Sequence, residues 1–341
     1  MILFLNGDYP FCYYYRGYLP GVYGNQLVVD YLRPNQERLK ELIQKANTVV
    51  FQRPSKKEHV SLMKSVKAMG KKVIFENDDT YHAIPLERLG NDRQREIAKE
   101  MAATLDEALT VAHGAIASTP ILAEEYKKVN PNTIVLKNCI DPMDRFPVKP
   151  NTTGKFRVGF IGSVTTNDDY IHIKDQIKQM DSEGMSIVVM GIKYQDGTHL
   201  PIMQNDYDFW ASLNNVEWHP YVPVHEYMAK VASLALDVVI IPRKEHYFNQ
   251  CKSNLKFLEM SLLKIPVIAQ GFSDGTSPYQ GVDEPYMTVI VDNSCWFQTV
   301  NRVKLNYDHY KALAITAHDY VLDNYNIKAY AQEWVQQINN L

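Results

Sequence analysis

The sequence predicts an α/β protein built from two parallel-sheet domains. Its 341 residues exceed what one hydrophobic core usually holds, so two domains are expected. In both halves, short β-branched, apolar runs alternate with segments of helical periodicity, which indicates parallel sheets with right-handed crossovers. A stretch with three prolines and no periodicity, residues 141–154, separates the two halves.

Each half carries the patterns of one such domain. In the first half we predict strands at Met1–Leu5, Thr48–Gln52, Lys72–Glu76, Gly114–Ala117 and Thr133–Leu136, and helices at Gln26–Leu32, Lys56–Met69, Asp92–Val111 and Pro120–Lys128. In the second half we predict strands at Phe156–Ile161, Ser186–Met190, Asn215–Trp218, Leu236–Ile241, Pro266–Ala269 and Thr288–Val291, and final helices at Asp308–Asp323 and Ile327–Ile338. No Gly-x-Gly-x-x-Gly follows the first strand, so a dinucleotide cofactor is not expected there.

Composition excludes several classes of protein. The four cysteines lie far apart, which argues against a disulfide framework or a zinc site and is typical of a reducing compartment. No apolar run approaches the length of a membrane span. The N-terminus lacks the basic region of a signal peptide and is instead a strand pattern, so we expect a cytoplasmic protein.

Positive charge is concentrated in the first half. Residues 1–150 hold 21 Lys and Arg against 18 Asp and Glu, whereas the whole chain has a net charge of −3. Much of the excess lies between Arg53 and Lys72, where Lys64, Lys67 and Lys71 share one helical face. Such a basic stripe attracts nucleic acid, anionic lipid or acidic glycan, or it is simply a solvated helix face.

The most informative stretch is the strand, loop, helix and strand that end at Gln270. Ligands of open α/β sheets bind at the carboxyl ends of strands. Ser253 is a good N-cap there, and free N–H groups at a helix start attract anions. Lys252 and Lys256 would take phosphate charge, while Glu259 would accept hydrogen bonds from ribose. The alternative is an ordinary helix with solvated lysines and a Glu259–Lys256 pair.

This stretch resembles the nucleotide-sugar signature of GT-B glycosyltransferases, specifically the large retaining family four and its relatives. The matching residues are Pro242, Phe248, Asn249, Lys252, Ser253, Leu255, Lys256, Leu258, Glu259, Pro266 and Val267. Many members carry a further glutamate that contacts the donor sugar, at the position where this sequence has Cys251.

The resemblance implies two Rossmann-like domains facing a cleft, at residues 1–148 and 149–320. It also implies a last helix, residues 321–341, that crosses back onto the first domain and is anchored by Trp334. The implied activity is transfer of a hexosyl or pentosyl group from a nucleoside-diphosphate sugar to an acceptor hydroxyl, with retention and with no metal or other cofactor. The implied acceptor is a glycan or a lipid-linked sugar, and peripheral membrane contact stays open.

The donor site is expected in the second half. Gly162 and Ser163 follow a strand and let backbone N–H groups approach phosphate. Many members place a basic residue after this glycine, and Arg243 takes that role here. The expected donor-binding residues are Gly162, Ser163, Asn249, Ser253, Asn254, Lys256, Glu259 and Tyr221, the last lying where relatives hold the base. The expected catalytic residues are Arg243, Lys252, Asp79 and His82.

Two loops of the first half are the acceptor-side candidates. The first holds Asp8 and Tyr9 and runs through a tyrosine-rich loop to Arg16, which suits stacking on a sugar or base and a phosphate clamp. The alternative is a loop that packs under the next helix. In the second, Asp78 and Asp79 would bind a metal or orient a hydroxyl while His82 exchanges a proton, or the loop is a capped turn.

Three other functions stay open. One is a phage-type glycosyltransferase that modifies a hydroxylated base in DNA, a reaction that the basic stripe permits. Another is a non-catalytic nucleotide-sugar-binding protein, suggested by Cys251 and by the missing basic residue after Gly162. The third is a GT-B epimerase that acts on the same donor. Fold-level analogy does not choose among them.

Overall fold

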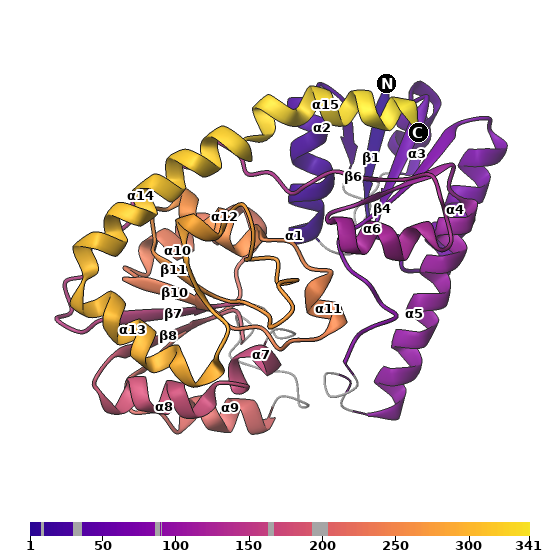
Figure 1. Ribbon diagram of the computed structural model, residues 1–341. Helices are drawn as coiled ribbons and strands as arrows, with labels where there is room; N and C mark the ends of the chain where they lie inside the picture. The colour runs from indigo at the N-terminus through magenta and orange to yellow at the C-terminus, as the bar shows by residue number, and fades with distance from the viewer. Residues whose placement is uncertain (8–9, 30–35, 86–88, 90, 163–166, 193–203) are drawn as a thin grey trace. The chain divides into compact units, whose positions relative to one another are not determined.

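The computed structural model describes residues 1–7, 10–29, 36–85, 89, 91–162, 167–192 and 204–341 (Figure 1). These residues form two compact units. Unit 1 comprises Met1–Pro142, Gln250–Ser253 and Tyr325–Leu341, and unit 2 comprises Met143–Asn249 and Asn254–Asn324. Each unit contains a six-stranded sheet whose strand pairs are all parallel. The predicted pair of parallel-sheet α/β folds is therefore confirmed.

The sheet of unit 1 has the strand order β2-β1-β3-β4-β5-β6. Its strands are β1 (Ile2–Asn6), β2 (Leu27–Val29), β3 (Thr48–Gln52), β4 (Lys72–Asn77), β5 (Gly114–Ala117) and β6 (Thr133–Val135). The strands β1 and β3 are buried along their whole length, as expected of a parallel sheet that is covered on both faces.

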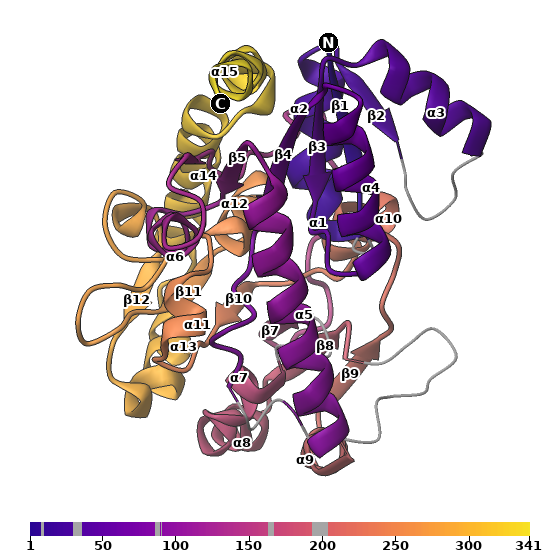
Figure 2. The same ribbon diagram turned by 90° about the vertical axis from the view of Figure 1, so that its right-hand side faces the viewer.

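Helices cover both faces of this sheet (Figure 2). They are α1 (Pro10–Tyr13), the π-helix η1 (Tyr14–Tyr18), α2 (Leu19–Tyr23), α3 (Gln36–Lys45), α4 (Lys57–Ala68), α5 (Asp92–Val111), α6 (Pro120–Lys127) and α15 (Ile327–Asn340). On one face, Phe75 shares a core cluster with Met63 of α4 and Leu105 of α5. On the other, Phe4 shares a cluster with Trp334 of α15, and α15 packs against α2.

Two predictions for this unit were wrong. The pattern at Gln26–Leu32 was expected to be helical, yet Leu27–Val29 forms the edge strand β2 and pairs with β1. A short apolar run with adjacent valines fits both the helical and the strand periodicity. Pairing with β1 makes this run a strand. The tyrosine-rich segment was expected to be a loop, but Pro10–Tyr23 is helical throughout. The helix α3 was not predicted.

The sheet of unit 2 has the strand order β12-β11-β10-β7-β8-β9. Its strands are β7 (Arg157–Ile161), β8 (Ser186–Met190), β9 (Val216–His219), β10 (Val238–Ile241), β11 (Val267–Gln270) and β12 (Thr288–Ile290). Its helices are α7 (Asn167–Ile171), α8 (Lys174–Ser182), α9 (Gln204–Ala211), α10 (Val224–Ser233), α11 (Tyr247–Gln250), α12 (Leu255–Leu262), α13 (Trp296–Leu305) and α14 (Tyr307–Asn324), with short 3-10 turns at Glu284–Tyr286 and Asn293–Cys295.

Aromatic packing fixes α7 on the core of unit 2. The ring of Phe160 on β7 meets Tyr170 of α7 and Trp210 of α9 edge-on, at centroid distances of 5.4 and 5.1 Å. The hydroxyl of Tyr170 also donates to the carbonyl of Ile161, at 2.9 Å. The first turn of α7 is thereby held beside the carboxyl end of β7. Among the described residues, no helix combines the length and apolarity that a bilayer span requires.

Candidate functional site

Asp169, in the first turn of α7, joins three segments at the carboxyl edge of the unit 2 sheet. Its Oδ2 accepts a hydrogen bond from Nη1 of Arg243, at 2.8 Å. Its Oδ1 accepts from the backbone N–H of Lys244, at 3.0 Å, and from Nδ2 of Asn249, at 2.9 Å. The Asp169 side chain is only 1% exposed. Its neighbour Asp168 pairs with the Lys244 ammonium at 2.7 Å.

Arg243 is the buried cation of this edge. Burial alone would lower its pKa, but Tyr279 and Asp169 outweigh burial and raise that pKa above its ordinary value. Its Nε atom and the Oδ1 atom of Asn249 are buried and have no hydrogen-bond partner among the described residues. Both residues were predicted from sequence as part of the donor site, and the structure brings them together around Asp169. They leave one donor and one acceptor for a ligand.

A second group lies on α12. The ammonium of Lys256 donates to Tyr227, at 2.5 Å, and to Oε2 of Glu259, at 2.7 Å. Tyr227 also donates to Glu259, at 3.0 Å, and burial followed by the charge of Glu259 raises the pKa of Tyr227 well above its ordinary value. The Glu259–Lys256 pair given above as the alternative is therefore present, and it holds both groups in the first turns of α12.

The start of α12 differs from the prediction. Asn254, not Ser253, is the N-cap residue, and its carbonyl accepts from the N–H of Phe257 at 2.8 Å. The Asn254 side chain donates to Asp283, at 2.6 Å. The hydroxyl of Ser253 accepts instead from Nδ2 of Asn138 in unit 1, at 2.7 Å. Residues 250–253 belong to unit 1, and the Ser253 hydroxyl contacts a residue of that unit and does not cap α12.

The remaining donor-side residues are only partly described. Tyr221 follows β9 and is 36% exposed, so its ring is accessible. Near it in sequence, His219 pairs with Glu217 at 2.7 Å, and burial lowers the pKa of His219. Gly162 directly follows β7, and its N–H donates to the carbonyl of Met190, at 3.1 Å. Ser163 lies outside the described residues.

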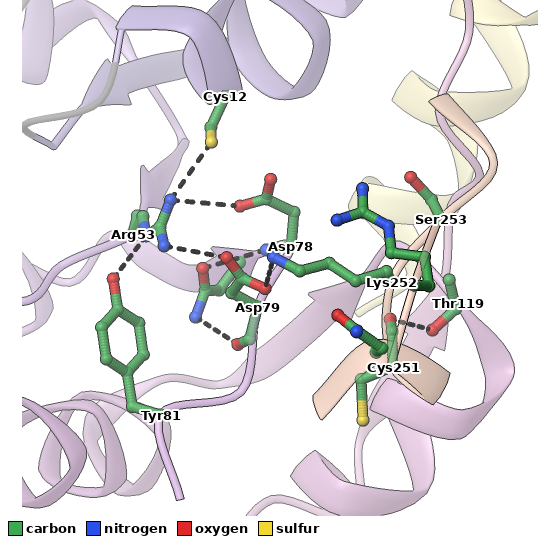
Figure 3. Close-up of polar contacts among 12 residues, drawn as sticks. Cys12, Arg53, Asp78, Asp79, Tyr81, Thr119, Cys251, Lys252 and Ser253 are labelled. Atoms are coloured by element: carbon green, nitrogen blue, oxygen red, sulfur yellow. Dashed lines mark hydrogen bonds and ion pairs between the residues drawn. The ribbon is translucent and has the colours of Figure 1, made fainter. Parts of the chain in front are cut away.

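In unit 1, an arginine missed by the sequence analysis occupies the carboxyl edge of the sheet (Figure 3). Arg53 follows β3 and is 10% exposed. Its guanidinium donates to the hydroxyl of Tyr81 at 2.6 Å, to Sγ of Cys12 at 3.1 Å and to Oδ2 of Asp79 at 3.1 Å, and Asp78 lies 3.8 Å away. The sequence analysis had grouped Arg53 with the basic stripe, although its place directly after a buried strand marked it out.

The backbone of Arg53 is strained. Its φ of 51° lies in the left-handed region, which costs an arginine on the order of 1–3 kcal/mol. The neighbouring loop is built around it, because a Cβ atom on Gly7 would lie 2.5 Å from the carbonyl oxygen of Arg53. Such strain is concentrated at functional sites, where surrounding contacts maintain it. Here those contacts aim the guanidinium at Asp79.

Lys252 reaches the same carboxylate. Its ammonium binds Oδ1 of Asp79, so Asp79 lies between two cations (Figure 3). Burial would raise the pKa of Asp78, but Arg53 and Lys252 outweigh burial and lower it. Lys252 was expected beside the diphosphate and Asp79 on the acceptor side, yet the two residues form one ion pair. Cys251, where many GT-B members carry the sugar-binding glutamate, is fully buried in the core of unit 1.

Arg16 is not the exposed phosphate clamp that was expected. It is 1% exposed, and its Nε atom donates to Oε1 of Glu76 at 2.6 Å. Its Nη1 atom donates to the carbonyl of Leu136, also at 2.6 Å, and the guanidinium lies 4.8 Å from the ring centroid of Trp334. The prediction was wrong because Arg16 lies within the π-helix η1, on the side that is buried in the unit. Asp8 and Tyr9 lie outside the described residues.

His82 lies beside a cavity of unit 1. Its Nε2 atom is 2.9 Å from Oδ1 of Asp106 on α5. The two side chains and Asp79 line a cavity of about 210 Å³ at the end of β4. This arrangement supplies a histidine with an orienting carboxylate next to a space that a small ligand can fill.

The lysines of the basic stripe are engaged by unit 1 itself. Lys64 pairs with Glu107 at 2.5 Å. The ammonium groups of Lys67, Lys71 and Lys72 donate to the carbonyls of Val111, Gln44 and Asn339, at 2.7–2.9 Å. Lys64 and Lys67 lie on α4, whereas Lys71 follows the end of that helix and Lys72 begins β4, so the expected single helical face of Lys64, Lys67 and Lys71 is not formed. The four lysines instead help to hold neighbouring segments of unit 1 together.

Comparison with known proteins gives a match of structure. No family model matches the sequence, and no curated protein matches it either. The chain is similar over 100% of its length to sucrose-phosphate synthase from Thermosynechococcus elongatus, with a TM-score of 0.69, 12% identity and 98% of that chain covered. It is also similar to a glycosyltransferase from Rickettsia africae, with a TM-score of 0.66, 10% identity, and 99% and 98% of the two chains covered. The HepE protein of Anabaena, solved with UDP and glucose, gives a TM-score of 0.64 at 13% identity, with 100% and 99% covered.

The chain has the GT-B fold. At identities this low, the likeness shows the fold alone, and the GT-B expectation drawn from residues 242–267 is confirmed at that level. The roles of individual residues follow from the geometry and are proposed below.

Proposed function

We propose that this chain is a glycosyltransferase that moves a sugar from a nucleoside-diphosphate sugar to an acceptor hydroxyl. The observation that carries the proposal is the edge of unit 2, where Nε of Arg243 and Oδ1 of Asn249 are buried beside Asp169 and have no hydrogen-bond partner among the described residues. Nucleotides bind at such edges of parallel sheets. HepE was solved with UDP and with UDP-glucose, which makes UDP-glucose the first donor to test.

The chemistry asks chiefly for stabilisation of the diphosphate leaving group. Fixed positive charge supplies this stabilisation without reorganisation during the reaction. Arg243 is a permanently charged donor whose Nε remains available. Lys256 and Lys252 would add positive charge if each ammonium group contacted phosphate while keeping its carboxylate partner. These partners are Glu259 for Lys256 and Asp79 for Lys252. Glu259 would accept hydrogen bonds from the ribose hydroxyls, a role that fits a buried carboxylate anchored by Tyr227.

On the acceptor side, His82 would orient the acceptor hydroxyl, with Asp106 fixing its ring. Asp79 then acts as the counter-ion of Arg53 and Lys252. We propose retention of the anomeric configuration, in keeping with the sequence resemblance around Glu259. The configuration of the product, read by NMR from the coupling constant of its anomeric proton, tests this point independently of the site.

The test is a screen of UDP-, GDP-, ADP- and dTDP-sugars by thermal shift and by release of nucleoside diphosphate. We expect one nucleotide class to stabilise the protein and to be turned over. Glu259→Ala should weaken binding of that nucleotide by about 10- to 100-fold, the worth of one or more hydrogen bonds to a charged group. Glu226→Ala, an exposed carboxylate on α10, is the control and should bind as the parent does.

Three results would decide against this assignment. If no nucleotide sugar binds, the chain is not a nucleotide-sugar enzyme. If Glu259→Ala binds like the parent, the site has been placed wrongly. Tight binding without turnover against a wide acceptor panel would indicate a nucleotide-sugar-binding protein.

A further inference from the structure

The cavity beside His82 lies in unit 1, where the loop after β4 faces α5 and α6. Its volume is about 210 Å³. A single water needs only about 10–15 Å³ of such space, whereas drug-sized ligands occupy about 300–1,000 Å³. The cavity is therefore suited to one small ring and is too small for an extended chain.

One side of the cavity is apolar and aromatic. It is lined by Leu105, Leu109 and Val129 and by the tyrosines 81 and 126. The hydroxyl of Tyr81 accepts from Arg53, at 2.6 Å, and that of Tyr126 donates to the carbonyl of Asp79, at 2.7 Å. Because both hydroxyls are bound to protein, the rings offer the cavity mainly hydrocarbon surface. Such surfaces pack against the C–H groups of a sugar ring.

The other side offers hydrogen-bond acceptors. Asp106 is 2.9 Å from His82, and Glu125 pairs with Lys128 at 2.6 Å. Ionised carboxylates only accept hydrogen bonds, so they suit ligand hydroxyls, which donate. The lining holds three carboxylates, Asp79, Asp106 and Glu125, against one lysine. Arg53 and Lys252 already neutralise Asp79, but Asp106 and Glu125 still outnumber Lys128 in the lining. A phosphate or a carboxylate in the cavity would therefore meet like charge, which disfavours it.

We propose that this cavity binds one neutral sugar ring of the acceptor. The inference rests on the proposed function, and it selects a glycan over DNA as the acceptor class. The ring's hydroxyls would donate to Asp106 and Glu125 while its C–H face lies on the tyrosines. The bound ring would place a hydroxyl next to His82.

The binding test uses saturation-transfer NMR with methyl glycosides of glucose, galactose, mannose and N-acetylglucosamine, without any donor. Val129→Trp should fill the cavity and reduce binding at least about tenfold, because the ring loses its space. Val135→Trp is the matched control, since Val135 is similarly exposed, at 37% against 39%, and is not among the residues that line the cavity. It should bind as the parent does.

A second variant tests the charge argument without changing the shape. The parent should prefer methyl glucoside to methyl glucuronide by at least about tenfold, and Glu125→Gln should shrink that preference several-fold, because one repelling charge is removed. The same panel includes a single-stranded oligonucleotide that carries 5-hydroxymethylcytosine. It should not compete with the sugar for the cavity.

The proposal is overturned if the parent binds none of the neutral sugars at tens of millimolar, if Val129→Trp binds like the parent, or if the oligonucleotide displaces the sugar. These failures are separate from failure of the proposed function. Hydrolysis of the donor in water needs no acceptor and reports on the donor site alone. If Val129→Trp hydrolyses the donor normally and binds the sugar like the parent, only the assignment of the cavity is rejected. Loss of donor binding with intact sugar binding would reject only the transferase.

Discussion

The carboxyl edges of the two sheets carry the same charges but hold them differently. In unit 1, Arg16, Arg53 and Lys252 face Glu76, Asp78 and Asp79. In unit 2, Arg243, Lys244 and Lys256 face Asp168, Asp169 and Glu259. In unit 2, the Asp169 carboxylate accepts three hydrogen bonds, two from the segment after β10 and one from α11. Unit 1 relies on a chain of contacts between distant segments, built around a strained arginine.

This difference separates two tasks. At the unit 2 edge, Nε of Arg243 has no hydrogen-bond partner among the described residues, which suits an anion. In unit 1, Nη2 of Arg16 also has none, but this guanidinium is enclosed by Glu76 and the ring of Trp334. The unit 1 edge places Asp79 between two cations and lies beside a cavity with surplus carboxylates, which is suited to hydroxyl groups. The two edges hold equal numbers of positive and negative side chains but suit different ligands. The arrangement of the side chains decides which of them can still contact a ligand. The predictions below test this contrast.

The largest expected effect is on stability. Arg53→Met removes a cation that binds Asp79, Tyr81 and Cys12 at once, and the Asp78 and Asp79 side chains beside it are only 19% and 12% exposed. We therefore expect unit 1 to lose about 3–5 kcal/mol of its free energy of unfolding. Arg243→Met should cost unit 2 less, because Asp169 keeps its bonds from Lys244 and Asn249. Hydrogen exchange followed by mass spectrometry on peptides from β3 and β10 measures the two units separately.

Arg38→Met is the control for this pair, since Arg38 is 65% exposed and its contact with Glu41 is worth little. Exchange in both units should then stay as in the parent. Equal losses from Arg53→Met and Arg243→Met would show that the two edges are built alike, against the contrast drawn above.

The next effect is on turnover. Lys252→Ala should lower kcat by about 10²- to 10³-fold, as expected when one charge that stabilises a leaving group is lost. The donor Kd should change much less, because Arg243, Lys256 and Glu259 remain. Lys64→Ala, which removes another lysine of unit 1 that is paired with a carboxylate, serves as the control. A Lys252→Ala protein with the parent's kcat would remove this lysine from the chemistry.

The sequence predicted most strands and the longest helix well. The helix α5 and the strands β3 and β5 lie at their predicted bounds, because long amphipathic patterns and short buried runs leave few alternatives. The segment at residues 27–29 was misjudged, since its structure depends on pairing with β1, a contact that local periodicity does not contain.

The candidate site was predictable only in part. Asn249, Lys256 and Glu259 could be proposed from the sequence because they lie in one short motif of known spacing. The pairing of Lys252 with Asp79 joins residues far apart in sequence, and no local pattern encodes it. Arg53 was missed because its role depends on a left-handed backbone, which the sequence signals only through the need for Gly7 beside it.

The smallest effect is a pH dependence within unit 1. Burial raises the pKa of Glu76 from its ordinary 4.5 to about 7, although Arg16 lowers it. The native state then holds this proton more tightly than the unfolded state does. Its contribution to stability is full below pH 4.5 and is lost as pH rises through 7, a change of about 3 kcal/mol.

Glu76→Gln keeps a hydrogen-bond acceptor for Arg16 but cannot ionise. In urea unfolding between pH 5 and 8, the parent should therefore lose stability relative to Glu76→Gln as pH rises. Glu58→Gln, an exposed carboxylate in the first turn of α4, should leave the pH profile of the parent unchanged. A flat profile over this range would mean that the Arg16 guanidinium holds Glu76 ionised despite its burial, because the carboxyl group would then be ionised in both the native and the unfolded state. In that case the Arg16–Glu76 pair would be a permanent ion pair, and the charges of the unit 1 edge would be as fixed as those around Asp169.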